Sequence, residues 1–170
     1  TGELETLMNA PTMFQAAQRI GRAIRSVHAT EGEALRSEDV SFDVSFLFGG
    51  QIKGERMRLF MIYSAGNFIE CTTDTPYLQI GEHKYGKPIL DRVVKPSTSL
   101  EDGQKAVLLS MDSTLRSNLS VGMPLDLAVI EKDACKVTLK RRIEAGDPAF
   151  RAMSDAWSTA LRDGFARIII

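Results

Sequence analysis

The sequence predicts an α+β fold in which helices and strands are segregated into layers. Three long stretches carry apolar residues at helical spacing, whereas two other regions hold short runs that alternate or are continuously apolar. The predicted order is a helix, three strands, a short helix, a long helix, a hairpin and a last helix. Because strands follow strands instead of alternating with helices, a layered sandwich is favoured over a parallel α/β sheet.

The composition is that of a single globular domain. A chain of 170 residues can bury a core, and 44% apolar with 25% charged residues argues against disorder. The 21 basic and 22 acidic residues nearly cancel, so we expect neither a nucleic-acid nor a membrane partner. Two cysteines suit a reducing cytoplasm, and no apolar run has membrane-spanning length. With two histidines, no histidine-rich metal site is predicted, and we expect no cofactor.

The first helix is predicted to begin at Asn9, a possible cap, with Pro11 in its first turn. It should end near His28, where the imidazole would meet the negative end of the helix dipole. A second helical piece is expected over residues 31–37. One helical face carries the apolar residues Phe14, Ala17, Ile20, Ala23, Ile24 and Val27.

An antiparallel meander is predicted to follow. Residues 42–48 alternate apolar and polar side chains, and residues 57–63 are almost continuously apolar. A hairpin turn over 64–67 leads into a strand over 68–71. A fourth short strand is expected over 77–80.

Residues 81–88 contain two glycines and a lysine, but they lack the glycine spacing and the Ser/Thr position of a phosphate-binding P-loop. We therefore expect an exposed polar loop, which includes His83, and then a short helix over 88–94.

The long helix is predicted to start near Thr98, which has capping-box spacing with Glu101. Its apolar face comprises Leu100, Val107, Leu108, Met111 and Leu115.

A polar turn follows this helix and contains Ser117, Asn118 and Ser120, before Gly122 and Pro124. Such a turn beside a buried strand can line a reactive cleft. The alternative is a plain connection whose hydroxyls satisfy backbone groups.

The last third is predicted to form a hairpin from residues 125–130 and 135–143. Asp147 and Pro148 then mark the start of a final helix. Its apolar residues are Phe150, Met153, Trp157, Ala160, Leu161 and Phe165. The apolar tail 168–170 is predicted to dock on a neighbouring molecule.

Four stretches, at residues 48–52, 65–70, 79–92 and 112–122, are similar to characteristic stretches of the bacterial ancestral-β-subunit (Anbu) family. That family resembles proteasome β-type subunits. The resemblance implies the four-layer αββα sandwich of N-terminal-nucleophile hydrolases. It implies that residues 1–170 are a single proteasome β-type domain, the C-terminal two-thirds of the subunit, with the fold incomplete at its N-terminus.

The resemblance also implies which residues act. The family's nucleophilic threonine, its aspartate, its lysine and its oxyanion-hole turn would all precede Pro11, so Thr1 is not expected to be the nucleophile. Ser120 matches a serine near the nucleophile's amino group, and Ser117 matches a position where proteasome subunits carry an aspartate. Glu82 stands where those subunits usually have a serine.

The resemblance therefore implies a subunit of a self-compartmentalising threonine peptidase that assembles with identical subunits into a ring or spiral and cleaves peptides. Two alternatives remain: a non-catalytic scaffold of the same fold, or another N-terminal-nucleophile amidohydrolase. Because the nucleophile is expected upstream, residues 1–170 alone should not hydrolyse peptides.

Overall fold

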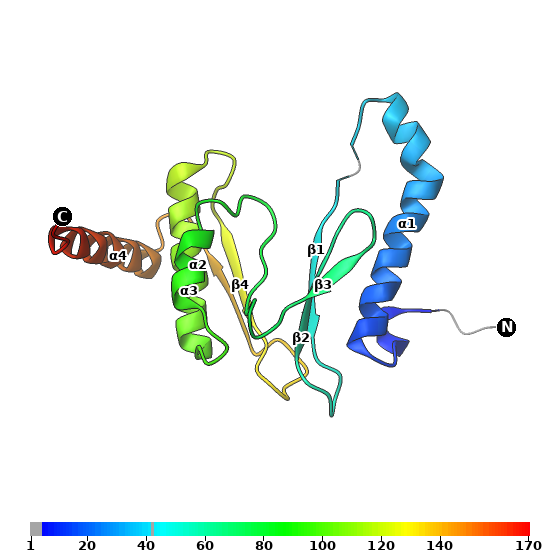
Figure 1. Cartoon of the computed structure of the whole chain (residues 1–170), viewed down its shortest axis with the longest axis horizontal. Helices are drawn as coiled ribbons and strands as arrows, with labels where there is room; N and C mark the ends of the chain where they lie inside the picture. The colour runs from blue at the N-terminus through cyan, green and yellow to red at the C-terminus, as the bar shows by residue number, and fades with distance from the viewer. Residues whose placement is uncertain (1–4, 42) are drawn as a thin grey trace. The chain divides into compact units, whose positions relative to one another are not determined.

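The computed structural model describes residues 5–41 and 43–170 and confirms the α+β class (Figure 1). The chain divides into two compact units. The first runs to Ile80 and includes Lys132–Cys135, and the second comprises Gly81–Glu131 with Lys136–Ile170. Helix α1 and a three-stranded sheet build the first unit, whereas α2, α3, α4 and a two-stranded sheet build the second.

Helix α1 (Met13–Ser37) is capped by Thr12, whose Oγ1 accepts a hydrogen bond of 3.1 Å from the Gln15 amide. The prediction that Asn9 caps this helix was wrong, because Asn9 ends a separate 3₁₀ turn, η1 (Leu7–Asn9).

The predicted end of α1 near His28 was also wrong, since the helix continues without interruption to Ser37. Within this continuous helix the Thr30 hydroxyl donates a hydrogen bond of 3.0 Å to the carbonyl of Ser26, one turn earlier. His28 therefore lies in the helix interior and does not meet the dipole at its end.

The first sheet is the predicted antiparallel meander, formed by β1 (Phe46–Gly50), β2 (Arg58–Ile62) and β3 (Phe68–Glu70). Strand β1 begins later than predicted and runs through both of its glycines; Phe42 lies outside the described residues. A Cβ on Gly49 would come within 3.1 Å of Leu59 Cδ1 across the ladder, so a residue without a side chain suits this pairing.

The predicted strand over 77–80 does not form. An alternation of only four residues before a glycine is a weak strand signal, and these residues join no sheet.

The core of the first unit lies between α1 and one face of the sheet (Figure 1). Phe68 meets Phe60 and Phe14 edge to face, with ring centroids 5.6 and 5.2 Å apart. The buried core residues are Met13, Ala17, Ile24, Phe60 and Ile62.

Helix α1 approaches the β2–β3 turn closely at Gly21. A Cβ on Gly21 would overlap the carbonyl oxygen of Gly66, which also accepts a hydrogen bond of 2.9 Å from Arg25 Nη1. Gly66 itself has a φ of +76°, which completes the predicted hairpin turn.

An ion-pair cluster ties β2 to β3 in the same unit. Arg58 makes a bidentate contact with Glu70, with Nε–Oε1 and Nη2–Oε2 distances of 2.8 and 2.6 Å. Arg56 adds a third bond to this carboxylate at 2.9 Å. The Arg58 hydrogen bonds hold the pKa of Glu70 below its ordinary value of 4.5.

In the second unit, β4 (Leu125–Val129) and β5 (Leu139–Ile143) pair antiparallel, with Leu125 opposite Ile143. This confirms the predicted hairpin. Strand β5 starts later than the sequence suggested because Asp133 and Cys135 take positive φ values of 67° and 48° in the connecting turn.

Helix α2 (Lys87–Val93) lies where the short helix was predicted, and α3 (Leu100–Ser117) follows. The cap of α3 is Ser99 instead of Thr98, since Ser99 Oγ accepts from the Asp102 amide at 3.1 Å. The predicted apolar face of α3 was wrong in part: Leu100 and Val107 are exposed. Its buried residues are small or polar, namely Ala106, Ser110, Asp112 and Thr114.

Helix α4 (Pro148–Ala166) begins as predicted, because Asp147 Oδ1 accepts a hydrogen bond of 2.8 Å from the Phe150 amide. Its predicted apolar face is largely open. Leu161 and Phe165 are exposed, as are all three residues of the tail 168–170, and the buried residue of α4 is Ser154. In the described part of the chain, no helix has the length and apolar character needed to cross a membrane.

Replacing Gly21 with alanine should destabilise the first unit. The methyl group would gain about 1 kcal/mol in helix propensity, but overlap with the Gly66 backbone should cost about 1–3 kcal/mol or more. Thermal unfolding should show a lower midpoint for Gly21→Ala. The control Gly103→Ala on α3 meets no atom within 4 Å and should raise the midpoint. Equal midpoints for the two variants would contradict the close approach.

Replacing Glu70 with glutamine should lower stability at pH 7 by on the order of 1–2 kcal/mol, because Arg58 loses its charged partner. The folded pKa of Glu70 is depressed. Its contribution is therefore full above the unfolded pKa and is lost as the pH falls through the folded pKa. Denaturant unfolding of wild type and Glu70→Gln should converge well below pH 4.5. The exposed pair of Glu144 with Arg142 serves as control, and Glu144→Gln should change little at any pH.

Candidate functional site

The polar turn, defined here as residues 117–120, is built at the C-terminal end of α3. Asn118 ends the helix, and its amide bonds the Thr114 carbonyl at 2.9 Å. The Asn118 side chain then folds over the turn, where Oδ1 accepts from both the amide and the hydroxyl of Ser120, at 2.8 and 2.7 Å. Ser117 and Ser120 are exposed, so both hydroxyls can be reached from solvent.

These contacts determine whether the Ser120 hydroxyl donates or accepts further hydrogen bonds. A hydroxyl has one proton to donate and two lone pairs to accept. The proton of Ser120 is committed to Asn118, so a further group near Ser120 Oγ would find an acceptor. The turn can therefore receive a hydrogen bond from an ammonium or amide N–H.

Asn118 holds the conformation of the polar turn, and this role was not assigned to it from the sequence. It was noted only as one of several short polar side chains. The signal was available, because an Asn two residues before a Ser has the spacing of an Asx-turn, in which the side chain bonds the backbone two residues on.

Asp112, Arg116 and Ser154 form a polar cluster, whose two α3 members lie just before the polar turn in the chain. We call it the Asp112 cluster. Ser154 Oγ donates to Asp112 Oδ1 at 2.7 Å and accepts from Arg116 Nη2 at 2.6 Å. Arg116 Nε closes the cluster onto Asp112 Oδ2 at 3.2 Å. Asp112 and Ser154 are each 5% exposed. The cluster joins the last turns of α3 to α4.

A second contact supports the same helix from the side of α2. Gly86, the N-cap of α2, packs so closely on Ser110 that a Cβ would overlap the Ser110 hydroxyl. Thr114 Oγ1 donates to the Ser110 carbonyl at 2.9 Å, one turn before the polar turn.

The structure does not bring together all the predicted site residues. Glu82 is exposed in the loop before α2, and no hydrogen bond within the described residues joins it to the polar turn. Thr1 lies outside the described residues.

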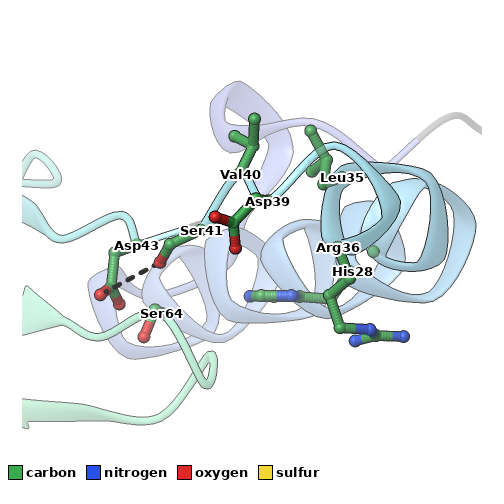
Figure 2. Close-up of a pocket in the computed structure, with 9 residues that line it drawn as sticks. His28, Leu35, Arg36, Asp39, Val40, Ser41, Asp43 and Ser64 are labelled. Carbon is green, nitrogen blue, oxygen red and sulfur yellow. Dashed lines mark hydrogen bonds between the residues drawn. The ribbon is translucent and has the colours of Figure 1, made fainter.

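A separate cavity of about 440 Å³ lies in the first unit, between the end of α1, the segment that follows it and the β2–β3 turn (Figure 2). Figure 2 shows side chains of both charge signs around it, including Arg36 and Asp39. Its one drawn hydrogen bond, from Ser41 to Asp43, is long at 3.5 Å. Among the described residues, no group of three or more His, Cys, Asp or Glu side chains is placed to hold a metal ion.

Comparison with known proteins gives consistent matches. The sequence profile of the proteasome subunit family matches residues 21–130. Anbu from Hyphomicrobium sp. strain MC1 is 54% identical over 100% of this chain and 69% of its own, with a TM-score of 0.88. Anbu (ancestral beta-subunit) from Yersinia bercovieri is 45% identical over 98% of this chain and 69% of its own, again with a TM-score of 0.88.

A third similar structure is the helical assembly of the Anbu complex from Pseudomonas aeruginosa. It is 42% identical over 95% of this chain and 67% of its own, with a TM-score of 0.88. Among curated proteins, none matches the chain.

Proposed function

We propose a function from the premise that this chain belongs to the proteasome subunit family and, within it, to the Anbu proteins. Its fold is accordingly the proteasome-type N-terminal-nucleophile hydrolase fold, of class α+β. The proposed function is that of a subunit in a self-compartmentalising threonine peptidase, which hydrolyses peptide bonds. Residues 1–170 would act as one proteasome β-type domain.

One observation carries this proposal: the chain is 54% identical to an Anbu protein over 100% of its length. Identity at this level over a whole chain favours a shared chemistry as well as a shared fold. In this proposal the residues of this chain support the reaction, while the threonine nucleophile, its lysine and its aspartate lie elsewhere in the protein.

Ser120 would assist the general base. In threonine-peptidase chemistry the threonine's own α-amine takes the proton from its hydroxyl as that oxygen attacks the peptide carbonyl. The resulting ammonium needs an acceptor. Because Ser120 donates its proton to Asn118, its oxygen is left to accept a hydrogen bond from that ammonium.

Ser117 would contribute less than its counterpart in proteasome subunits. Where those carry an aspartate, this chain has a neutral hydroxyl, which cannot stabilise a nearby positive charge to the same degree. This substitution is the observation that favours the second candidate, a non-catalytic scaffold of the same fold. An amidohydrolase with a cysteine or serine nucleophile would also share this fold.

We further propose that identical subunits assemble through the exposed apolar surface of α4 and the tail. Leu161 and Phe165 are 53% and 79% exposed, and Ile168, Ile169 and Ile170 are exposed beyond them. Several exposed apolar side chains so close together in sequence are typical of an interaction site. The Pseudomonas aeruginosa relative is described as a helical assembly. Head-to-tail contacts between identical subunits produce such open helices or closed rings.

Ser120→Ala in the complete gene product should lower kcat by about 10²-fold, the range expected for a positioned group in acid–base catalysis. Stability should fall by only about 1 kcal/mol, because the hydroxyl is exposed. Fluorogenic peptide hydrolysis and thermal unfolding measure the two effects. The control Ser37→Ala removes a hydroxyl that bonds only its own helix and should leave kcat unchanged. Full peptidase activity of Ser120→Ala would show that Ser120 does not assist the reaction. No activity of the wild type on any peptide would favour the scaffold.

Phe165→Glu should weaken assembly, because a charge would be buried at the proposed contact of α4. Light scattering at micromolar concentration should show a large assembly for the wild type and smaller species for the variant. Met8→Glu changes a side chain that is also highly exposed, at 94%, but lies away from α4 in sequence, and should assemble like the wild type. A stable wild-type monomer, or unchanged assembly of Phe165→Glu, would contradict the proposed interface.

A further inference from the structure

We propose that the Asp112 cluster is a positioning device for the polar turn, in which Ser154 of α4 sets the orientation of Ser120. The inference rests on the proposed function, because it concerns the same site. Asp112 and Ser154 would act through the backbone of α3 and would not touch the substrate or the nucleophile.

The hydrogen bonding of the cluster is closed. Ser154 donates its proton to Asp112 and accepts from Arg116, and Arg116 bonds the remaining Asp112 oxygen. A carboxylate on a side chain that is only 8% exposed is costly unless it is paired and hydrogen-bonded. Removing the Ser154 hydroxyl would leave Asp112 with Arg116, a half-exposed side chain on the same helix, and would remove the hydrogen bond that fixes α3 against α4. The last turn of α3 could then rotate.

The cluster is directly linked to the turn through the chain. Arg116 precedes Ser117, and the amide of Asn118 is bonded to Thr114, between the two α3 members of the cluster. Asn118 Oδ1 in turn accepts hydrogen bonds from the amide and the hydroxyl of Ser120. A rotation of the last turn of α3 would consequently move the Ser120 oxygen.

The chemistry of this contact favours positioning over simple stability. Apolar side chains of similar volume often stabilise a fold as well as a buried ionic group does, or better. Here the apolar residues Leu100 and Val107 of α3 are exposed, while the buried contact with α4 is polar. Hydrogen bonds require one rotational setting between the two helices, whereas an apolar contact tolerates several.

Ser154→Ala in the complete gene product tests this role. Peptide hydrolysis should show kcat lower by about tenfold to 10²-fold, as expected for a misplaced group, with KM nearly unchanged. Ser154→Thr keeps the hydroxyl and should recover most of kcat. The matched control is Ser158→Ala, one turn further along α4, whose hydroxyl bonds only the Ser154 carbonyl of its own helix at 2.9 Å. It should behave like the wild type.

A second readout does not depend on activity. Amide hydrogen exchange at Asn118 and Ser120 should be about tenfold faster or more in Ser154→Ala, because the turn is released. Exchange at Tyr63, in the β2–β3 turn of the first unit, should not change. Asp112→Asn keeps the shape of the cluster but loses its charge, and should accelerate exchange at the same two amides.

The two proposals fail in distinguishable ways. A wild-type protein that cleaves no peptide overturns the proposed function, and the exchange rates still decide whether the cluster positions the turn. Equal exchange at Asn118 and Ser120 in Ser154→Ala and Ser158→Ala overturns the positioning role. Acceleration at every amide, including Tyr63, also overturns it, because the cluster would then be merely structural.

Discussion

The second unit depends on one constraint: a buried carboxylate on α3 must have partners. Asp112 cannot be buried at 5% exposure without them, and they come from one turn further along α3 and from α4. This requirement determines which face of α3 is turned inward, and so explains why apolar residues of that helix remain outside. The same orientation of α3 fixes the position of the polar turn, because the turn begins where the helix ends.

In the first unit, the helix is placed by a close approach of two backbones. Gly21 lets α1 lie against the Gly66 carbonyl, and Arg25 then bonds that oxygen. Aromatic side chains pack between the helix and the sheet. The Arg58 guanidinium carbon lies 4.9 Å from the centroid of the Phe60 ring, while the same guanidinium binds Glu70. The two units thus use different means to hold a helix against a neighbouring element.

Local signals were sufficient where one residue type decides the outcome. Asp147 before Pro148 gave the correct helix start, and the alternating and continuously apolar runs gave the meander, because these signals depend on neighbours in sequence. Predictions failed where several polar residues compete. The chain uses Thr12 and Ser99 as caps, close to the predicted Asn9 and Thr98, since packing chooses among adjacent candidates.

The candidate site shows the same division. The polar turn was predicted because its residues are consecutive, and the resemblance singled out Ser117 and Ser120. Ser154 could not be found in this way, because it lies 42 residues from Asp112 and a single serine on a helix carries no distinguishing signal. The buried face of α3 was missed for a related reason. Helical periodicity locates apolar residues, but it does not indicate that a carboxylate will be turned inward to meet a partner from α4.

Helix α4 connects the two proposed properties of the protein. Its Ser154 faces α3 and bonds Asp112, while Leu161 and Phe165 remain exposed about two and three turns further along the same helix. A helix is rigid over this distance, so a neighbouring subunit that docks on the exposed residues restrains the residue that holds the polar turn. If assembly occurs through α4, it therefore reduces the freedom of Ser120 without any direct contact with that residue. Subunit contact and the geometry of the site then depend on one element.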